Sequence, residues 1–110
     1  RVVLATESEF ARTLDSNGGG SDHAWAGNQI LISGDLRGAR VFNKFPASLK
    51  AGNDRDLGRG RLIPEYPWEN IMVPIAEWMG LEPGQHTDAF PNIGNFNTSH
   101  LIPRSELFKP

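Results

Sequence analysis

The most regular pattern in the chain is at residues 67–80, PWENIMVPIAEWMG, and it is that of an amphipathic helix. Its large apolar side chains recur at spacings of three and four, which places them on one helical face. Pro67 suits the first turn, where its missing N–H costs nothing, and Gly80 is a natural C-terminal cap. We predict a helix over residues 67–79 that is kinked or split at Pro74.

Two apolar runs upstream of this helix have the composition of short strands. Residues 2–6, VVLAT, form an apolar run that is typical of a buried parallel strand. Residues 29–33, QILIS, form the second candidate, and residues 39–42 are expected to pair back on it as a hairpin at about 29–42. Short strands together with one main helix predict an α/β fold class.

The remaining segments are expected to be loops. Residues 15–28 contain three consecutive glycines, while residues 43–64 are rich in Pro, Gly, Asn and Asp, and residues 80–110 have no regular period. Residues 10–14 are long enough for one helical turn. Because the chain opens directly on an apolar run without a methionine, we expect it to be a fragment or a processed product.

The composition argues against several classes of protein. The 110 residues carry 11 Lys and Arg against 13 Asp and Glu, so the basic face of a nucleic-acid binder is not expected. No stretch approaches the roughly 18 apolar residues that indicate a membrane span. There is no cysteine, which removes disulfides and thiolate metal sites. The 12 Gly and 8 Pro predict a loop-rich body that relies on the remainder of its own polypeptide or on other chains of an assembly.

The most suggestive chemical pattern is Ser21-Asp22-His23, directly after a run of glycines. An adjacent carboxylate and imidazole can both turn toward one divalent metal, and glycines let the backbone come close. A zinc site needs three or four protein ligands, of which this segment supplies two. The alternative is that Asp22 caps a turn while His23 only packs. Trp25, next to this segment, is a candidate for lining a pocket.

Two charged residues follow the first predicted strand at its carboxyl end, where open α/β sheets bind ligands. Glu9 is a candidate metal ligand or general base, and Arg12 is a candidate holder of an anion. The alternative is an ion pair between the two, three residues apart on a helical turn.

The two arginines near residue 60 have both a functional and a purely structural interpretation. The arginines of Gly58-Arg59-Gly60-Arg61 can grip phosphate or sulfate, or they can sit on an exposed turn and pair with Asp54 and Asp56. We favour the exposed turn, because no helix begins directly after it.

Two surface features bear on glycans. Asn97 begins the sequon Asn97-Thr98-Ser99 and is a candidate glycosylation site in a secreted eukaryotic protein. Trp25 and Trp68 are large aromatic residues that a carbohydrate-binding module would use as stacking platforms.

Four segments occur in an order and at a spacing that resemble one known family. They are SEFART at residues 8–13, GSDHAWAGN at 20–28, GRGRLIP at 58–64 and FPNI at 90–93. The chain resembles the C-terminal part of the domain-of-unknown-function family fifteen-oh-one, whose members are secreted, usually with a twin-arginine export signal. That family is in turn similar to the alkaline-phosphatase/sulfatase superfamily.

The resemblance implies that residues 1–110 are a single C-terminal segment of a larger α/β domain with a three-layer fold. It also implies a divalent metal (zinc, manganese or calcium) bound by Asp22 and His23. It further implies a secreted, periplasmic or cell-surface location. Trp25 and Asn28, beside the candidate metal site, are the candidate pocket residues. The expected activity is metal-dependent hydrolysis of a phosphate or sulfate ester, with an anionic ester or a glycan as ligand. The alternative is a non-catalytic extracellular or cell-surface subunit of a structural assembly that retains the fold.

The chain also departs from the family pattern. Ala11 stands where a glycine is usual, and neither His86 nor His100 lies in a motif that matches a further ligand. The superfamily's nucleophile comes from early strands that this sequence does not contain. The resemblance alone therefore does not establish hydrolysis.

Overall fold

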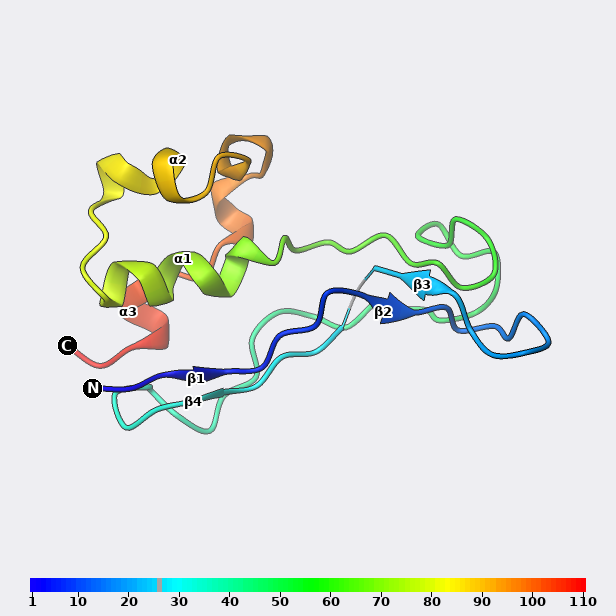
Figure 1. Ribbon diagram of the computed structural model, residues 1–110, viewed down its shortest axis with the longest axis horizontal. Coiled ribbons are helices and arrows are strands. Elements are labelled where there is room, and N and C mark those ends of the chain that lie inside the picture. The colour runs from blue at the N-terminus through cyan, green and yellow to red at the C-terminus, as the bar shows by residue number, and fades with distance from the viewer. Residues whose placement is uncertain (26) are drawn as a thin grey trace. The chain divides into compact units, whose positions relative to one another are not determined.

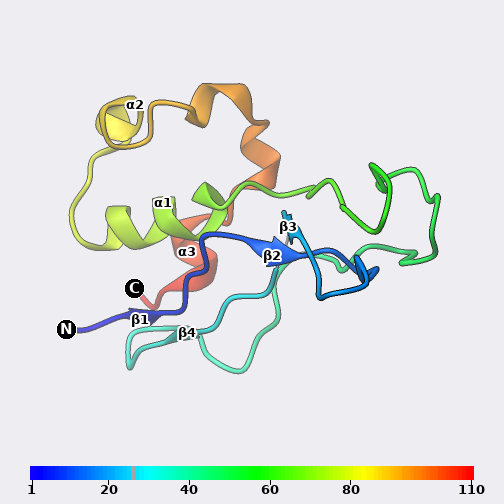
Figure 2. The same ribbon diagram turned by 45° about the vertical axis from the view of Figure 1, so that its right-hand side comes forward.

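The computed structural model describes residues 1–25 and 27–110, which divide into two compact units. The first, here called the helical unit, comprises Arg1–Leu4, Ile32–Asn43 and Glu65–Pro110. The second, the hairpin unit, comprises Ala5–Leu31 and Lys44–Pro64. Among the described residues the fold is mixed α and β, with two small sheets and three α-helices (Figures 1 and 2), so the predicted loop-rich α/β class is confirmed at this level.

The strands are short and pair differently from the prediction. β1 (Leu4–Ala5) pairs with β4 (Leu31–Ile32), so the runs at 2–6 and 29–33 do contain strands, and these strands pair with each other. The predicted hairpin at 29–42 is wrong, because residues 39–42 form no strand. The backbone φ of 59° at Ala39 is left-handed and interrupts any extended run there.

The segment after β4 pairs instead with the end of the chain. Leu36 forms an antiparallel bridge with Phe108, and the Arg37 N–H donates to the carbonyl of Leu107 at 2.9 Å. The Lys109 ammonium donates to the carbonyl of Gly34 at 2.8 Å. These bonds tie two sequence-distant segments of the helical unit together.

Helix α1 (Glu69–Trp78) confirms the predicted helix, with Trp68 and Met79 as its caps. It ends as predicted at Gly80, whose φ is 111° and whose N–H donates to the carbonyl of Glu77 at 3.1 Å. The predicted split at Pro74 is wrong, since the helix continues through it. The ring of Pro74 is among the largest fully buried side chains, and this burial offsets the hydrogen bond that proline cannot make.

The core of the helical unit lies where α1 contacts α3 (Arg104–Leu107), and the two helices lie side by side in both ribbon views (Figures 1 and 2). Phe108 is 1% exposed and stacks on Trp78 with ring centroids 5.1 Å apart. Oδ1 of buried Asn70 accepts the Ile102 N–H at 3.2 Å, which links α1 to the segment before α3 inside this core.

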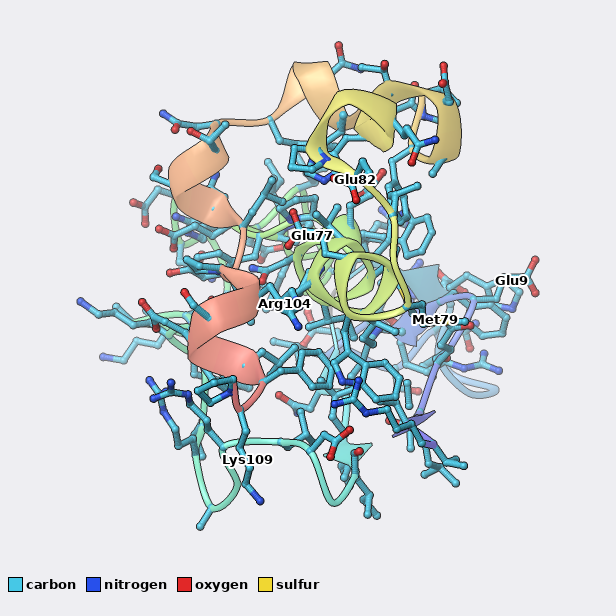
Figure 3. The ribbon with its side chains drawn as sticks, turned by 90° about the vertical axis from the view of Figure 1, so that its left-hand side faces the viewer. Glu9, Glu77, Met79, Glu82, Arg104 and Lys109 are labelled. Carbon is cyan, nitrogen blue, oxygen red and sulfur yellow. The ribbon has the colours of Figure 1, made fainter. Side chains whose placement is uncertain are left out.

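The tail predicted as loop contains several short helical segments. They are η1 (Pro83–Gln85), α2 (His86–Ala89), η2 (Ile93–Asn95), η3 (Thr98–His100) and α3. Figure 3 looks along α1 and shows Glu77 on the side toward α2, where its carboxylate lies 3.0 Å from the His86 imidazole. No helix among the described residues is long and apolar enough to cross a bilayer.

Candidate functional site

The two motifs around Arg12 and Asp22 are the arms of one hairpin. β2 (Ala11–Arg12) pairs antiparallel with β3 (His23–Ala24), and Arg12 lies opposite His23. The Thr13 N–H donates to the carbonyl of Asp22 at 3.0 Å, and the Asp22 N–H donates to the hydroxyl of Thr13 at 3.1 Å. The helical turn for which residues 10–14 are long enough is not formed, because pairing with β3 holds this segment extended.

The glycine-rich segment closes the hairpin as a tight loop. The Asn17 N–H and the Ser16 hydroxyl both donate to the carbonyl of Gly20, each at 2.9 Å. Gly18 has a φ of 93°, a conformation that glycine adopts without steric cost. The loop also directs the side-chain amide of Asn17 to Oδ1 of Asp22 at 2.7 Å.

A second turn in the same unit is built around the carboxylate of Asp56. It accepts the N–H groups of Gly52, Gly58 and Gly60 at 3.0, 2.8 and 2.9 Å. These donors, that of Gly52 first, hold the pKa of Asp56 below its ordinary value of 3.8. Asp56 therefore shapes the turn through backbone groups.

This turn packs directly on the hairpin. The Leu14 N–H donates to the carbonyl of Gly60 at 3.3 Å, and the Asp15 N–H donates to the carbonyl of Arg59 at 3.4 Å. Gly60 is buried with a φ of 70°, and a β-carbon there would lie 2.5 Å from Cβ of Leu14. The close approach requires glycine at this position.

The packed turn brings two arginines to the hairpin's aspartate. Oδ2 of Asp22 lies 2.8 Å from Nη1 of Arg59 and 3.5 Å from Nη2 of Arg61. The arginines thus pair with Asp22, whereas the sequence had suggested Asp54 and Asp56. The Asn17 amide first, and then Arg59 and Arg61, hold the pKa of Asp22 below its ordinary value. We call Asn17, Asp22, Arg59 and Arg61 the Asp22 cluster.

The other predicted site residues of the hairpin have different surroundings. Arg12 donates from Nη1 to the carbonyl of Ser21 at 2.9 Å, and its guanidinium lies 5.1 Å from the ring centroid of Phe10. The ring of His23 stacks on the same Phe10 with centroids 3.7 Å apart. Glu9 is exposed (Figure 3), and no ion pair joins it to Arg12 among the contacts of the described residues.

Asp22 and His23 meet different neighbours because they are successive residues of an extended segment. Side chains alternate between the two faces of a strand. The carboxylate of Asp22 accordingly meets Asn17 and the two arginines, while the imidazole of His23 meets Phe10. The carboxylate of Asp22 and the imidazole of His23 therefore have different partners, although the two residues are adjacent in the chain.

Three further predicted residues lie on the surface. Trp25 is 41% exposed and Asn28 is exposed in the hairpin unit. Asn97 is exposed in the helical unit, where its side chain accepts the Ser99 N–H at 3.0 Å and caps η3. The residue between Trp25 and Gly27 lies outside the described residues.

The donors found here do not make a ready metal site. Both oxygens of Asp22 already accept from Asn17 or the arginines, and a zinc site needs three or four ligands. Among residues 1–25 and 27–110, no group of three His, Cys, Asp or Glu side chains is placed to hold a metal ion. A cation bound by Asp22 and His23 stays a prediction from the sequence motif.

Comparison with known protein families, curated proteins and solved structures found no match to this chain. The family resemblance therefore rests on the four sequence motifs and stays a prediction.

The sequence interpretation missed the anchoring role of Asp56 and the partners of Asp22. A signal for the first was present, because Asp followed two residues later by Gly, as in Asp56-Leu57-Gly58, is typical of a turn in which the carboxylate accepts backbone N–H groups. No local signal links Asp22 to Arg59, since that contact depends on how the turn packs.

The lowered pKa of Asp56 predicts acid sensitivity of the hairpin unit. Because the folded-state pKa lies below the unfolded value, the stabilisation is present above the unfolded pKa and is lost as the pH falls through the folded pKa. Asp56→Asn should therefore lower stability at neutral pH and flatten the acid limb of a plot of urea midpoint against pH. Asp54→Asn is the matched control. If the acid limb of the plot for Asp56→Asn is as steep as that for the parent, the prediction is contradicted.

Proposed function

We propose that the chain is part of a secreted hydrolase of phosphate or sulfate esters, to which the Asp22 cluster contributes the groups that bind the anionic ester. One observation supports this: two guanidinium groups converge on a single carboxylate at the end of the hairpin. Arg59 and Arg61 carry two positive charges and Asp22 carries one negative charge. The cluster therefore keeps a net positive charge that attracts an anion. The planar fork of arginine matches the oxygens of phosphate and sulfate.

The arginines are placed to meet a ligand from solvent. Their side chains are 42% and 43% exposed, and the turn that carries them is fixed to the hairpin by backbone bonds. A bound ester would replace Asp22 as their partner, and the same donors would stabilise negative charge that develops on the ester oxygens. Glu9 as general base and Arg12 as a further anion donor belong to this proposal through the family resemblance.

A divalent cation held by Asp22 and His23 is proposed on the sequence motif and the resemblance. Such a cation would polarise an ester oxygen. Elemental analysis of the purified protein tests this part, with Asp22→Ala expected to lose a stoichiometric metal and Asp54→Ala expected to keep it. Equal metal content in both variants would rule out Asp22 as a ligand.

Turnover of aryl phosphates and aryl sulfates tests the hydrolase. Loss of one preorganised donor lowers catalysis by on the order of 10²-fold, so Arg59→Gln should reduce turnover by about that factor. Arg104→Gln, on α3 of the helical unit, is the control and should leave turnover unchanged. Turnover that is equal in both variants would exclude the arginine from the reaction.

The second candidate is a non-catalytic extracellular or cell-surface assembly subunit. It is favoured by the fact that Asp22 is already neutralised by Arg59 and Arg61 from its own chain, an arrangement that needs no ligand. Absence of both metal and turnover in an assembly that retains its structure would favour this candidate over the hydrolase.

A further inference from the structure

Asn17 is the only asparagine in the chain that is followed by glycine. Glycine has no β-carbon, so its backbone nitrogen can approach the preceding side-chain amide more closely than any other residue's can. Both residues are exposed, and a β-carbon at Gly18 would meet nothing within 4 Å. Solvent therefore reaches both residues.

The hydrogen bonds of the loop support an attack of the Gly18 nitrogen on that amide. The Gly18 N–H donates to the hydroxyl of Ser16 at 3.1 Å, so an acceptor is in place for the proton that the nucleophile must lose. The Gly19 N–H donates to Oδ1 of Asn17 at 2.9 Å. A donor at this oxygen stabilises the negative charge that develops there when a nucleophile adds to the carbonyl carbon.

We propose that Asn17 is a site of spontaneous deamidation, and that the modification alters the Asp22 cluster. The Gly18 nitrogen forms a bond to Cγ of Asn17 and gives up its proton. The bond from Cγ to Nδ2 breaks, and the nitrogen leaves as ammonia after gaining a proton from solvent. Water then opens the cyclic imide to give aspartate or isoaspartate, with no change in oxidation state.

The consequence follows from what the Asn17 amide does in the folded chain. It donates to Oδ1 of Asp22 at 2.7 Å, and it is the largest influence that lowers the pKa of that carboxyl. A carboxylate in its place has no proton to donate and carries the same charge as Asp22, so this hydrogen bond is replaced by repulsion. Deamidation would thus leave Arg59 and Arg61 with two carboxylates nearby and would weaken the binding of any further anion.

Incubation of the full chain at mildly alkaline pH, followed by peptide mapping and enzymatic methylation of isoaspartate, tests the first part. Isoaspartate should accumulate at Asn17 well before Asn28, an exposed asparagine that precedes Gln29 and serves as the internal control. Gly18→Ala should remove most of this product, and Asn17→Gln should remove all of it if Gly18→Ala fails to fold. Equal rates at Asn17 and Asn28 would overturn the proposal.

The second part is tested by NMR of the arginine side chains in Asn17→Asp, which carries one product of the reaction. The guanidinium signals of Arg59 and Arg61 should differ from those of the parent, because a second carboxylate lies beside their partner Asp22, while the signal of Arg104 should stay where it is. Unchanged signals of Arg59 and Arg61 would show that the modification does not reach the cluster.

Discussion

In the variant Gly60→Ala, the hairpin unit should unfold at a urea concentration well below the unfolding midpoint of the parent protein. In Gly60→Ala the new carbon would lie 2.5 Å from Cβ of Leu14 and 2.8 Å from its backbone nitrogen, neither of which is the mobile end of a long side chain. The left-handed backbone costs about 1–2 kcal/mol for a residue other than glycine. Overpacking adds about 1–3 kcal/mol.

Gly52→Ala separates these two contributions. Its φ of 73° nearly equals the 70° of Gly60, and a β-carbon there would meet nothing within 4 Å. Gly52→Ala should therefore lower the free energy of unfolding only by the cost of the left-handed backbone, without the cost of overpacking. Equal losses in Gly52→Ala and Gly60→Ala would show that the turn does not pack on Leu14.

Truncation of Phe108 should be the most damaging change in the helical unit. The side chain is 1% exposed, stacks on Trp78 and follows α3 directly, so Phe108→Ala removes a ring from the contact between α1 and α3. Deletion of a buried aromatic side chain costs about 3–5 kcal/mol. Urea unfolding followed by far-ultraviolet circular dichroism measures the loss.

Phe96→Ala is the matched control, because Phe96 is 38% exposed in the same unit. It should lose much less stability than Phe108→Ala. A Phe108→Ala variant no less stable than Phe96→Ala would mean that the C-terminal segment does not complete the core.

The helix and its ends were predictable because their signals are local. The spacing of apolar residues in α1 and the glycine at position 80 each act within a few residues, and both have the predicted role. The split at Pro74, one of the two predicted effects of this residue, was wrong for the opposite reason. Its effect depends on tertiary burial, which the sequence pattern does not report.

Strand partners and the site were less predictable because both are non-local. The run at 29–33 was correctly assigned as a strand and wrongly assigned to a partner, since pairing with β1 competes with any local hairpin. Likewise Asp22 was identified as chemically suggestive while Arg59 was assigned to an exposed turn, and only the packing of the turn at Gly60 on Leu14 brings them together.

Binding of inorganic sulfate and phosphate, followed by NMR of the arginine side chains, examines the anion-binding role of the Asp22 cluster. The guanidinium signals of Arg59 and Arg61 should shift with either anion and not with chloride at equal ionic strength, while that of Arg104 stays fixed. Asp22→Asn should tighten sulfate binding, because it removes the internal carboxylate that competes for the arginines. Signals that shift equally at all three arginines, or weaker binding by Asp22→Asn, would contradict this role.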